Sequence, residues 1–169
     1  MHIYRNKLNG RIPTEVGLLT DLGSLYLDNN HLTGGIPTEV GNLKNVEQIF
    51  LHKNYMNGTI PSEIGRMESL ANLRLYTNGL VGTIPTELAN AFKLKYIYLQ
   101  DNILKGTVPE TLGNLTNLKE LHLYWNHFEG TVQEKFCDLI ESRLTEFKSD
   151  CAGDVPKVKC DCCTACFAE

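Results

Sequence analysis

The chain has 169 residues, of which 42% are hydrophobic, and a formal net charge of −4 at pH 7. This composition is sufficient for one packed domain and excludes a largely disordered chain. It contains no run of about 20 apolar residues that could cross a membrane, and its scattered Lys and Arg residues give no basic patch for nucleic acid.

From its first residues the sequence repeats itself every 24 residues. The strongest markers are an Asn and a Gly that recur at fixed positions in each of six turns, and a Pro that recurs in five of them. The asparagines are Asn6, Asn30, Asn54, Asn78, Asn102 and Asn126; the glycines are Gly10, Gly34, Gly58, Gly82, Gly106 and Gly130; the prolines are Pro13, Pro37, Pro61, Pro85 and Pro109.

Each turn predicts the same succession of elements, with the consensus LxLxxNxLxGxIPxxLGxLxxL. The LxL alternation predicts a short strand with both leucines on its inner side. The Asn that follows can turn its amide inward and bond the peptide groups of adjoining turns. Gly and Ile-Pro then bend the chain, and the second apolar cluster returns it through a short helical or 3₁₀ segment. One turn cannot bury its own leucines, so the stacked turns form a single solenoid core.

The segments "NHLTGGIPTEVGNL", "NYMNGTIPSEIGRM" and "NGLVGTIPTELANA" share a Gly-x-Ile-Pro signature. With it, residues 1–136 resemble the plant-type leucine-rich repeat family, and are similar to receptor-like ectodomains of that family. The resemblance implies an α/β solenoid: a right-handed superhelix with a parallel concave β-sheet and short 3₁₀ or helical convex segments. Ala89 stands in place of the usual Gly and Gln133 in place of Pro, which suggests decay of the pattern toward the end of the array.

The beginning of the sequence lacks the polar cap that a repeat array normally carries. Met1 falls at the offset of Leu25, so the chain opens inside a strand and the first of the six repeats in residues 1–136 is incomplete. We therefore expect these residues to be part of a longer array, through truncation or through a start at an internal Met. The lack of visible signal-peptide features then carries no information about compartment.

The strand positions that alternate with the inner leucines are rich in aromatic residues, and six of the seven tyrosines and the sole Trp fall there. Strand propensity and cross-strand ladders of rings would also place aromatics on a sheet. Propensity does not favour one face, however, and Tyr, Trp and Arg dominate interaction hot spots. The predicted ligand-binding concave face consists of Tyr26, Phe50, His52, Arg74, Tyr76, Tyr96, Tyr98, Gln100, His122, Tyr124 and Trp125.

The histidines on this face do not predict chemistry. His2, His52 and His122 lie among acidic residues, but in separate turns and without a neighbouring nucleophile. We therefore expect no catalytic residue, no metal and no cofactor.

A row of hydroxyl side chains also recurs once per turn, at Thr59, Thr83, Thr107 and Thr131. Such a row can match an ice lattice, and some plant leucine-rich repeat proteins are used in that way. Thr is also simply favoured in short strands. Two sequons, which begin at Asn57 and Asn114, offer glycosylation acceptors if the chain is secreted.

After residue 136 the repeat ends, and residues 137–169 form a predicted Cys-rich cap. Helix-like spacing of Leu139, Ile140, Leu144 and Phe147 predicts a segment that covers the last turn. A disulfide framework is favoured over a zinc site or a redox CxxC motif. In the favoured pairing, Cys137 and Cys151 each bond into the cluster of the other four, whose remaining two thiols pair locally. The cysteines are Cys137, Cys151, Cys160, Cys162, Cys163 and Cys166. The cap is similar to the Cys-dense ends of algal leucine-rich repeat proteins.

These features predict a non-enzymatic module, extracellular or at the cell surface, that recognises a peptide or protein ligand through its concave face. By resemblance, the parent would be a receptor-like or secreted leucine-rich repeat protein, with a co-receptor or cell-wall component as a further partner. The alternatives are an inhibitor or adhesion module for cell-wall enzymes or glycans, and an ice-binding solenoid that uses the Thr row. Neither nucleic acid nor a membrane span is expected.

Overall fold

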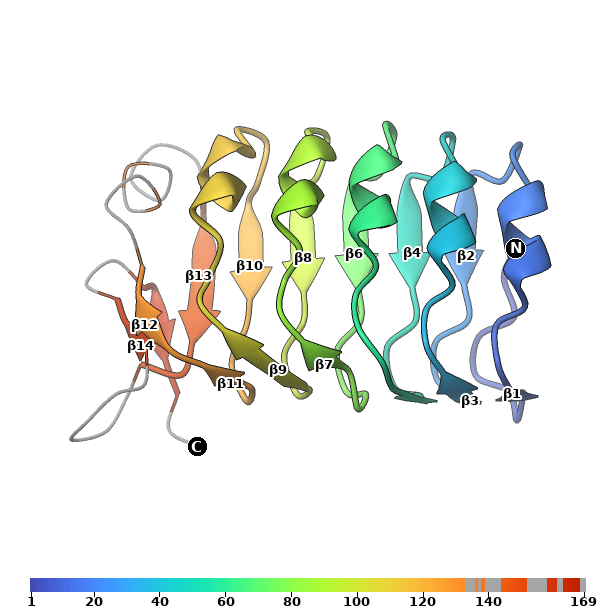
Figure 1. Cartoon of the computed structure of the whole chain (residues 1–169), viewed down its shortest axis with the longest axis horizontal. Coiled ribbons are helices and arrows are strands. Elements are labelled where there is room, and N and C mark those ends of the chain that lie inside the picture. The colour runs from blue at the N-terminus through green and yellow to red at the C-terminus, as the bar shows by residue number, and fades with distance from the viewer. Residues whose placement is uncertain (133–135, 137, 139–143, 152–157, 161–162, 168–169) are drawn as a thin grey trace.

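A computed structural model describes residues 1–132, 136, 138, 144–151, 158–160 and 163–167. Successive turns of the chain stack side by side, and the turns that start at residues 24, 48, 72 and 96 each contribute a strand to one long sheet and a 3₁₀ helix to the opposite side (Figure 1). The pairing of the strands is parallel throughout the described residues. The parallel leucine-rich solenoid predicted from the sequence is confirmed.

In the described part of the chain the main sheet has seven strands, in the order β15-β13-β10-β8-β6-β4-β2. Each turn places an apolar residue of this sheet in register with the next, so that Leu25, Ile49, Leu73 and Ile97 form one buried row that continues through Leu121. The strands are β2 (Ser24–Tyr26), β4 (Gln48–Phe50), β6 (Asn72–Arg74), β8 (Tyr96–Tyr98), β10 (Glu120–His122), β13 (Glu146–Ser149) and β15 (Ala165–Cys166).

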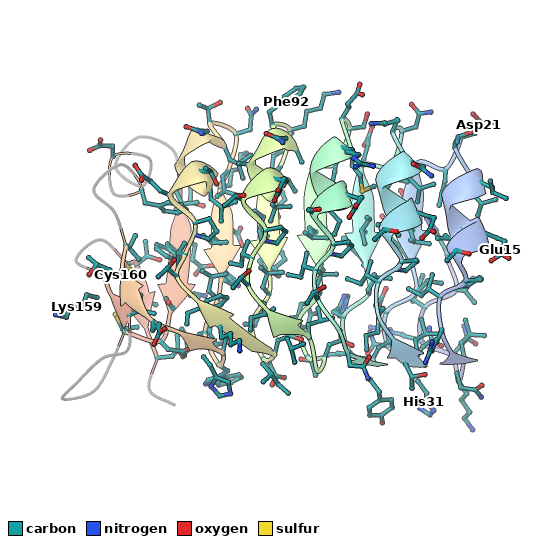
Figure 2. All side chains as sticks on the ribbon, in the orientation of Figure 1. Glu15, Asp21, His31, Phe92, Lys159 and Cys160 are labelled. Carbon is teal, nitrogen blue, oxygen red and sulfur yellow. A yellow bond between two sulfur atoms is a disulfide. The ribbon has the colours of Figure 1, made fainter. Side chains whose placement is uncertain are left out.

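Among the described residues, five 3₁₀ helices form the opposite side, and a Pro with φ between −71° and −62° precedes each of them. Pro suits this place because its fixed φ fits the entry to a helical turn. An N–H at the start of a helix has no intrahelical acceptor, so Pro forfeits no hydrogen bond there. The helices are η1 (Thr14–Leu18), η2 (Thr38–Asn42), η3 (Ser62–Arg66), η4 (Thr86–Asn90) and η5 (Glu110–Asn114). Side chains fill the space between them and the main sheet, whereas His31 and Phe92 point away from it (Figure 2).

Short strands along one side of the solenoid join consecutive turns in smaller sheets, and each turn there carries a Gly with positive φ. At Gly82, for example, φ is 82° and an added Cβ would lie 2.9 Å from Cγ2 of Thr59. All six recurrent glycines share the positive φ, whereas space is tight at Gly82 and open at Gly10. The short strands are β1 (Asn9–Gly10), β3 (His31–Gly34), β5 (Tyr55–Met56), β7 (Val81–Gly82), β9 (Ile103–Gly106), β11 (His127–Phe128), β12 (Gly130–Thr131) and β14 (Val158–Lys159).

The recurrent asparagines fasten adjoining turns to one another. The amide nitrogen of Asn54 donates to the carbonyl oxygens of Leu27 and Leu51, both at 3.0 Å, and its oxygen accepts from the Leu32 N–H at 3.0 Å. Asn30, Asn78, Asn102 and Asn126 make corresponding bonds to a neighbouring turn. Asn6 differs, because it is exposed and its amide donates to the Tyr4 carbonyl oxygen of its own turn.

The main sheet continues past residue 136. Phe147 lies in strand β13 and is completely buried in register with Leu121, so its assignment to a helix was wrong. The helix-like spacing of apolar residues was a false signal, because Phe147 lies in a further parallel strand of the sheet, paired with β10. Leu144 is also buried, whereas Leu139 and Ile140 lie outside the described residues.

Two disulfides are described in this C-terminal part, Cys151–Cys166 and Cys160–Cys163. They agree with two parts of the predicted scheme, the crossing bond of Cys151 and the local bond within the cluster. The remaining part of that scheme involves Cys137 and Cys162, which lie outside the described residues. Within the part of the chain that is described, no helix has the length and apolar character to cross a bilayer.

Candidate functional site

A column of stacked side chains runs along the solvent-facing side of the main sheet. The rings of His2 and Tyr26 stack at 4.2 Å between centroids, and those of Tyr26 and Phe50 at 4.5 Å. This spacing follows from the parallel register, which repeats equivalent positions at about 4.8 Å. The rings therefore stabilise one another across the strands as well as forming a surface.

Arg74 continues this column where the aromatic residues are interrupted. Its guanidinium lies 4.4 Å from the centroid of the Phe50 ring and 5.1 Å from that of Tyr98. Arg74 is thus placed between two rings by cation–π contacts, and its Nε donates to Asn72 Oδ1 at 3.2 Å. A guanidinium held in this way presents its remaining N–H groups at low conformational cost.

A second column lies beside the first, at the ends of the same strands. The His52 and Tyr76 rings stack at 4.2 Å, and Tyr124 stacks at 4.2 Å on Phe167 of the C-terminal segment. Trp125 packs edge-on against Tyr124, with 5.0 Å between centroids, and remains 52% exposed. The single Trp is therefore a surface residue at the edge of the concave face.

Residues of both columns line a groove of about 450 Å³ over β2, β4 and β6. Its lining combines aromatic rings with polar and charged groups: Tyr4, Arg5, Tyr26, Asp28, Asn29, Phe50, His52, Lys53, Arg74 and Tyr76. Such a mixture of large rings and a few directed polar groups suits recognition of a peptide-sized ligand.

The charges of the groove are predominantly positive. Arg5, Lys53 and Arg74 line it, against one carboxylate, Asp28. That carboxylate is already engaged, because one of its oxygens accepts from the Asn29 amide at 2.8 Å and lies 3.6 Å from His52 Nε2. A ligand in the groove therefore meets more cationic than anionic side chains, although the chain as a whole has a negative net charge.

His52 forms part of the groove floor and is neutral at neutral pH. Burial lowers the pKa of His52 to about 4, against the opposing effect of the nearby Asp28 carboxylate. Its Nδ1 is buried and has no hydrogen-bond partner within the described residues. Burial also raises the pKa of Tyr76, which stacks on it. Both rings thus act as neutral contact surface.

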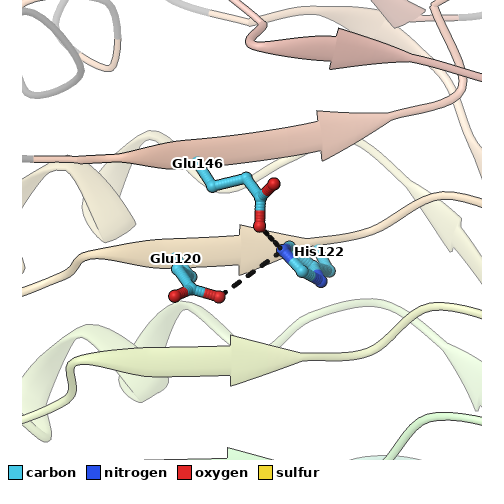
Figure 3. A group of neighbouring side chains, drawn as sticks. All are labelled: Glu120, His122 and Glu146. Carbon is cyan, nitrogen blue, oxygen red and sulfur yellow. Dashed lines mark hydrogen bonds and ion pairs between the residues drawn. The ribbon is translucent and has the colours of Figure 1, made fainter.

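At the other end of the main sheet the character of the face changes. Glu120 and His122 of β10 lie beside Glu146 of β13, and His122 Nε2 is 2.8 Å from Glu146 Oε2 and 3.8 Å from Glu120 Oε2 (Figure 3). Burial lowers the pKa of His122, although its hydrogen bond with Glu146 opposes this shift. In the part of the chain that the structure describes, two carboxylates, Glu120 and Glu146, therefore stand here against one cation, Lys148.

The predicted concave-face residues are divided between these two ends. Tyr26, Phe50, His52, Arg74 and Tyr76 come together around the groove. Tyr96, Tyr98, Gln100, His122, Tyr124 and Trp125 lie farther along the array, toward β10. Of these, Tyr98 has a raised pKa because of burial and because its hydroxyl donates to Glu120 at 2.7 Å.

Glu146 and Phe167 also belong to this face, and the sequence did not predict them. Glu146 follows Glu120 by 26 residues, so the 24-residue period does not point to it. Phe167 reaches the face through β15 and its neighbouring disulfide. No periodic signal could have placed either residue.

The other predicted surface features are accessible. Asn57 and Asn114, the sequon asparagines, are both exposed. The four threonines of the Thr row, Thr59, Thr83, Thr107 and Thr131, are also exposed.

Comparison with known proteins identifies the repeat. The family described as Leucine Rich Repeat matches residues 21–43, 93–115 and 117–139. The chain belongs to the leucine-rich repeat family, in its plant-type form. Among curated proteins there is no match.

Several solved leucine-rich repeat structures share the fold. The ectodomain of the Arabidopsis thaliana membrane receptor kinase GASSHO1/SCHENGEN3, in complex with CASPARIAN STRIP INTEGRITY FACTOR 2, is 35% identical with a TM-score of 0.80 over 85% of this chain and 17% of its own. A TDR receptor is 33% identical with a TM-score of 0.83 over 88% of this chain and 26% of its own. The chain thus spans about a sixth to a quarter of these receptor structures.

A plant ice-binding protein also has this leucine-rich repeat fold. It is 28% identical, with a TM-score of 0.80, over 95% of this chain and 49% of its own. The same scaffold therefore occurs in proteins with different kinds of ligand, so the fold alone does not decide the function.

Proposed function

We propose that this leucine-rich repeat segment is a non-catalytic recognition module that binds a peptide or a protein segment along its concave face. The observation that carries the proposal is the groove over β2, β4 and β6, where stacked rings hold Arg74 in place and Arg5 and Lys53 stand at the rim. An extended peptide advances about 3.3 Å per residue, so a short segment would cover these strands.

Similar proteins support this proposal. Related ectodomain structures include a receptor kinase bound to CASPARIAN STRIP INTEGRITY FACTOR 2 and HAESA bound to the peptide hormone IDA and the co-receptor SERK1. By analogy, the ligand is a secreted peptide, the setting is extracellular, and a co-receptor is a further partner. The positive groove favours a peptide that carries at least one free carboxylate.

The test is selection of binding peptides from a random 12-residue library displayed on phage, followed by affinity measurement with purified protein. We expect Tyr76→Ala to weaken the selected peptides by about tenfold or more, because it removes a ring from the groove. The matched control is Tyr55→Ala, since Tyr55 is 66% exposed and lies on β5, away from the concave face. Selected peptides that bind both variants and the wild-type protein equally would contradict the proposal.

A second candidate function, ice binding, is favoured by one observation: four exposed threonines recur along the side of a fold shared with a plant ice-binding protein. Four rungs at about 4.8 Å give a row about 14 Å long. Arg11 and Gly35 occupy the equivalent positions in the first two turns, so the row does not extend further. Inhibition of ice recrystallisation that is lost in Thr83→Tyr and retained in Tyr76→Ala would favour this second function.

A further inference from the structure

Three potential metal ligands converge where β10 meets β13 (Figure 3). His122 Nε2 lies 2.8 Å from Glu146 Oε2 and 3.8 Å from Glu120 Oε2. One oxygen of each carboxylate and this ring nitrogen all lie within 4.8 Å of one another. A tetrahedral Zn²⁺ with bonds of about 2.0–2.1 Å separates its ligand atoms by about 3.3 Å, so small side-chain rotations would complete the set.

The sheet itself brings the three groups together. Glu120 and His122 are two residues apart on β10, so they project from the same face. Parallel pairing sets Glu146 directly opposite Glu120 and places its carboxylate beside the imidazole. The cluster therefore draws on two strands whose relative position is fixed by backbone hydrogen bonds and by the buried Phe147.

Neighbouring groups orient the two carboxylates. The Tyr98 hydroxyl donates to Glu120 Oε2 at 2.7 Å. Lys148 Nζ lies 2.6 Å from Glu146 Oε1, which leaves Oε2 directed at His122. Outer contacts of this kind hold metal ligands in position. The Lys148 charge opposes a cation, but the two carboxylates outnumber it.

The imidazole is held in place for ligation because only 9% of His122 is exposed and its Nε2 is directed at both carboxylates. A neutral ring can offer Nε2 to a metal while Nδ1 holds the proton. The sequence suggested no metal here because His2, His52 and His122 occupy separate turns, and Glu146 lies outside the period.

We propose that Glu120, His122 and Glu146 form a binding site for a divalent transition-metal ion of the Zn²⁺ type. One nitrogen and two oxygen ligands suit Zn²⁺, whereas Ca²⁺ and Mg²⁺ prefer six or more oxygens. Three protein ligands leave a coordination position for water or for a group of a bound partner. The site lies outside the groove of the proposed peptide ligand and does not rest on that function.

The test uses the metal alone, so its failure is distinguishable from a failure of the peptide proposal. ZnCl₂ is titrated into the full chain by calorimetry, and Co²⁺ is followed by its visible absorption bands. We expect one equivalent to bind with a dissociation constant in the micromolar range. His122→Gln and Glu146→Gln are each expected to weaken binding at least about tenfold.

The matched control is His31→Gln, which removes an exposed imidazole on β3 outside the main sheet and should leave binding unchanged. His122 is nearly buried, so a second variant is needed in case His122→Gln does not fold. Glu120→Gln serves this purpose, because its amide oxygen can still accept the hydrogen bond from the Tyr98 hydroxyl. No Zn²⁺ binding below about 1 mM, or binding that is the same in every folded variant, would overturn the proposal.

Discussion

The two ends of the concave face use the same backbone for opposite chemistry. Over β2, β4 and β6 the face is a groove of stacked rings with Arg5, Lys53 and Arg74, whereas at β10 and β13 it presents Glu120 and Glu146 around a nearly buried His122. The inner residues at both ends form one continuous row. The difference teaches that the solenoid fixes the positions of side chains, while the outward residues of each turn determine what those positions recognise.

The largest expected effect tests whether β13 is a rung of the same sheet. Phe147→Ala should lower the free energy of unfolding by about 3–5 kcal/mol, as much as removal of a core residue from the middle of the array, because Phe147 is completely buried. Leu73→Ala on β6 is the comparison, and both can be measured by chemical denaturation. A cost under about 1 kcal/mol for Phe147→Ala would separate the C-terminal strand from the cooperative core.

Next in size is the loss of an inward asparagine. Asn54→Ala should cost about 2–4 kcal/mol, because it removes four side-chain hydrogen bonds and leaves buried peptide groups unsatisfied. Asn126→Ala should cost a similar amount, since Asn126 makes corresponding bonds at the other end of the sheet. Asn6→Ala is the control and should cost less than about 1 kcal/mol, because Asn6 is exposed.

A smaller effect is the pH dependence of stability that His52 gives to the groove. Burial lowers the pKa of His52 from 6.5 to about 4, so between these values the unfolded chain binds more protons than the folded chain. The stability contributed by neutral His52 is therefore complete above pH 6.5 and is lost as the pH falls toward 4. The nearby Arg74 and Lys53 act in the same direction, whereas Asp28 opposes it.

We expect this loss to be about 1–3 kcal/mol in the wild-type protein and to be reduced in His52→Gln. His31→Gln, which changes an exposed ring, should keep the wild-type slope. Denaturant unfolding at pH 7, 5.5 and 4 measures the difference. If His52→Gln and the wild-type protein lose stability in parallel, the assignment of this slope to His52 is incorrect.

The smallest effect concerns a backbone conformation common to both ends. The residue before each recurrent Asn has a positive φ, and at Thr77 this value is 55°. A β-branched residue is strained there, whereas Asn, present at the equivalent position 29, tolerates it better. Thr77→Asn should raise the free energy of unfolding by about 0.5–1 kcal/mol, measurable as a higher Tm. A lower Tm would contradict this assignment of strain.

The repeated part of the fold could be predicted because each turn meets the same physical demands. Leu73 must be buried, Asn54 must satisfy peptide groups and Gly82 must adopt a positive φ, so all three recur at a fixed period. Thr77 escaped prediction because its φ is imposed by the turn and not by its own preference. Residues beyond the period, such as Glu146 and Phe147, could not be placed without knowledge of how β13 pairs.

For the candidate site, the sequence could predict only which side of the sheet the residues occupy. Alternation assigned Phe50, Arg74 and Tyr98 to the outer side of the sheet, but the position of the Arg74 guanidinium between two rings depends on side-chain packing. The division of the face into a cationic and an acidic end likewise depends on which charged groups already have partners, as Asp28 does in the amide of Asn29.

The most direct test of the recognition surface is the affinity of a library-selected peptide for two charge reversals, Lys53→Glu and Lys105→Glu. Both lysines are exposed, but Lys53 lines the groove and Lys105 lies on β9, outside it. We predict that Lys53→Glu weakens binding by about tenfold at low salt, with a smaller effect at high salt, and that Lys105→Glu has little effect. Equal affinities for the two variants at low salt would contradict recognition through the concave groove.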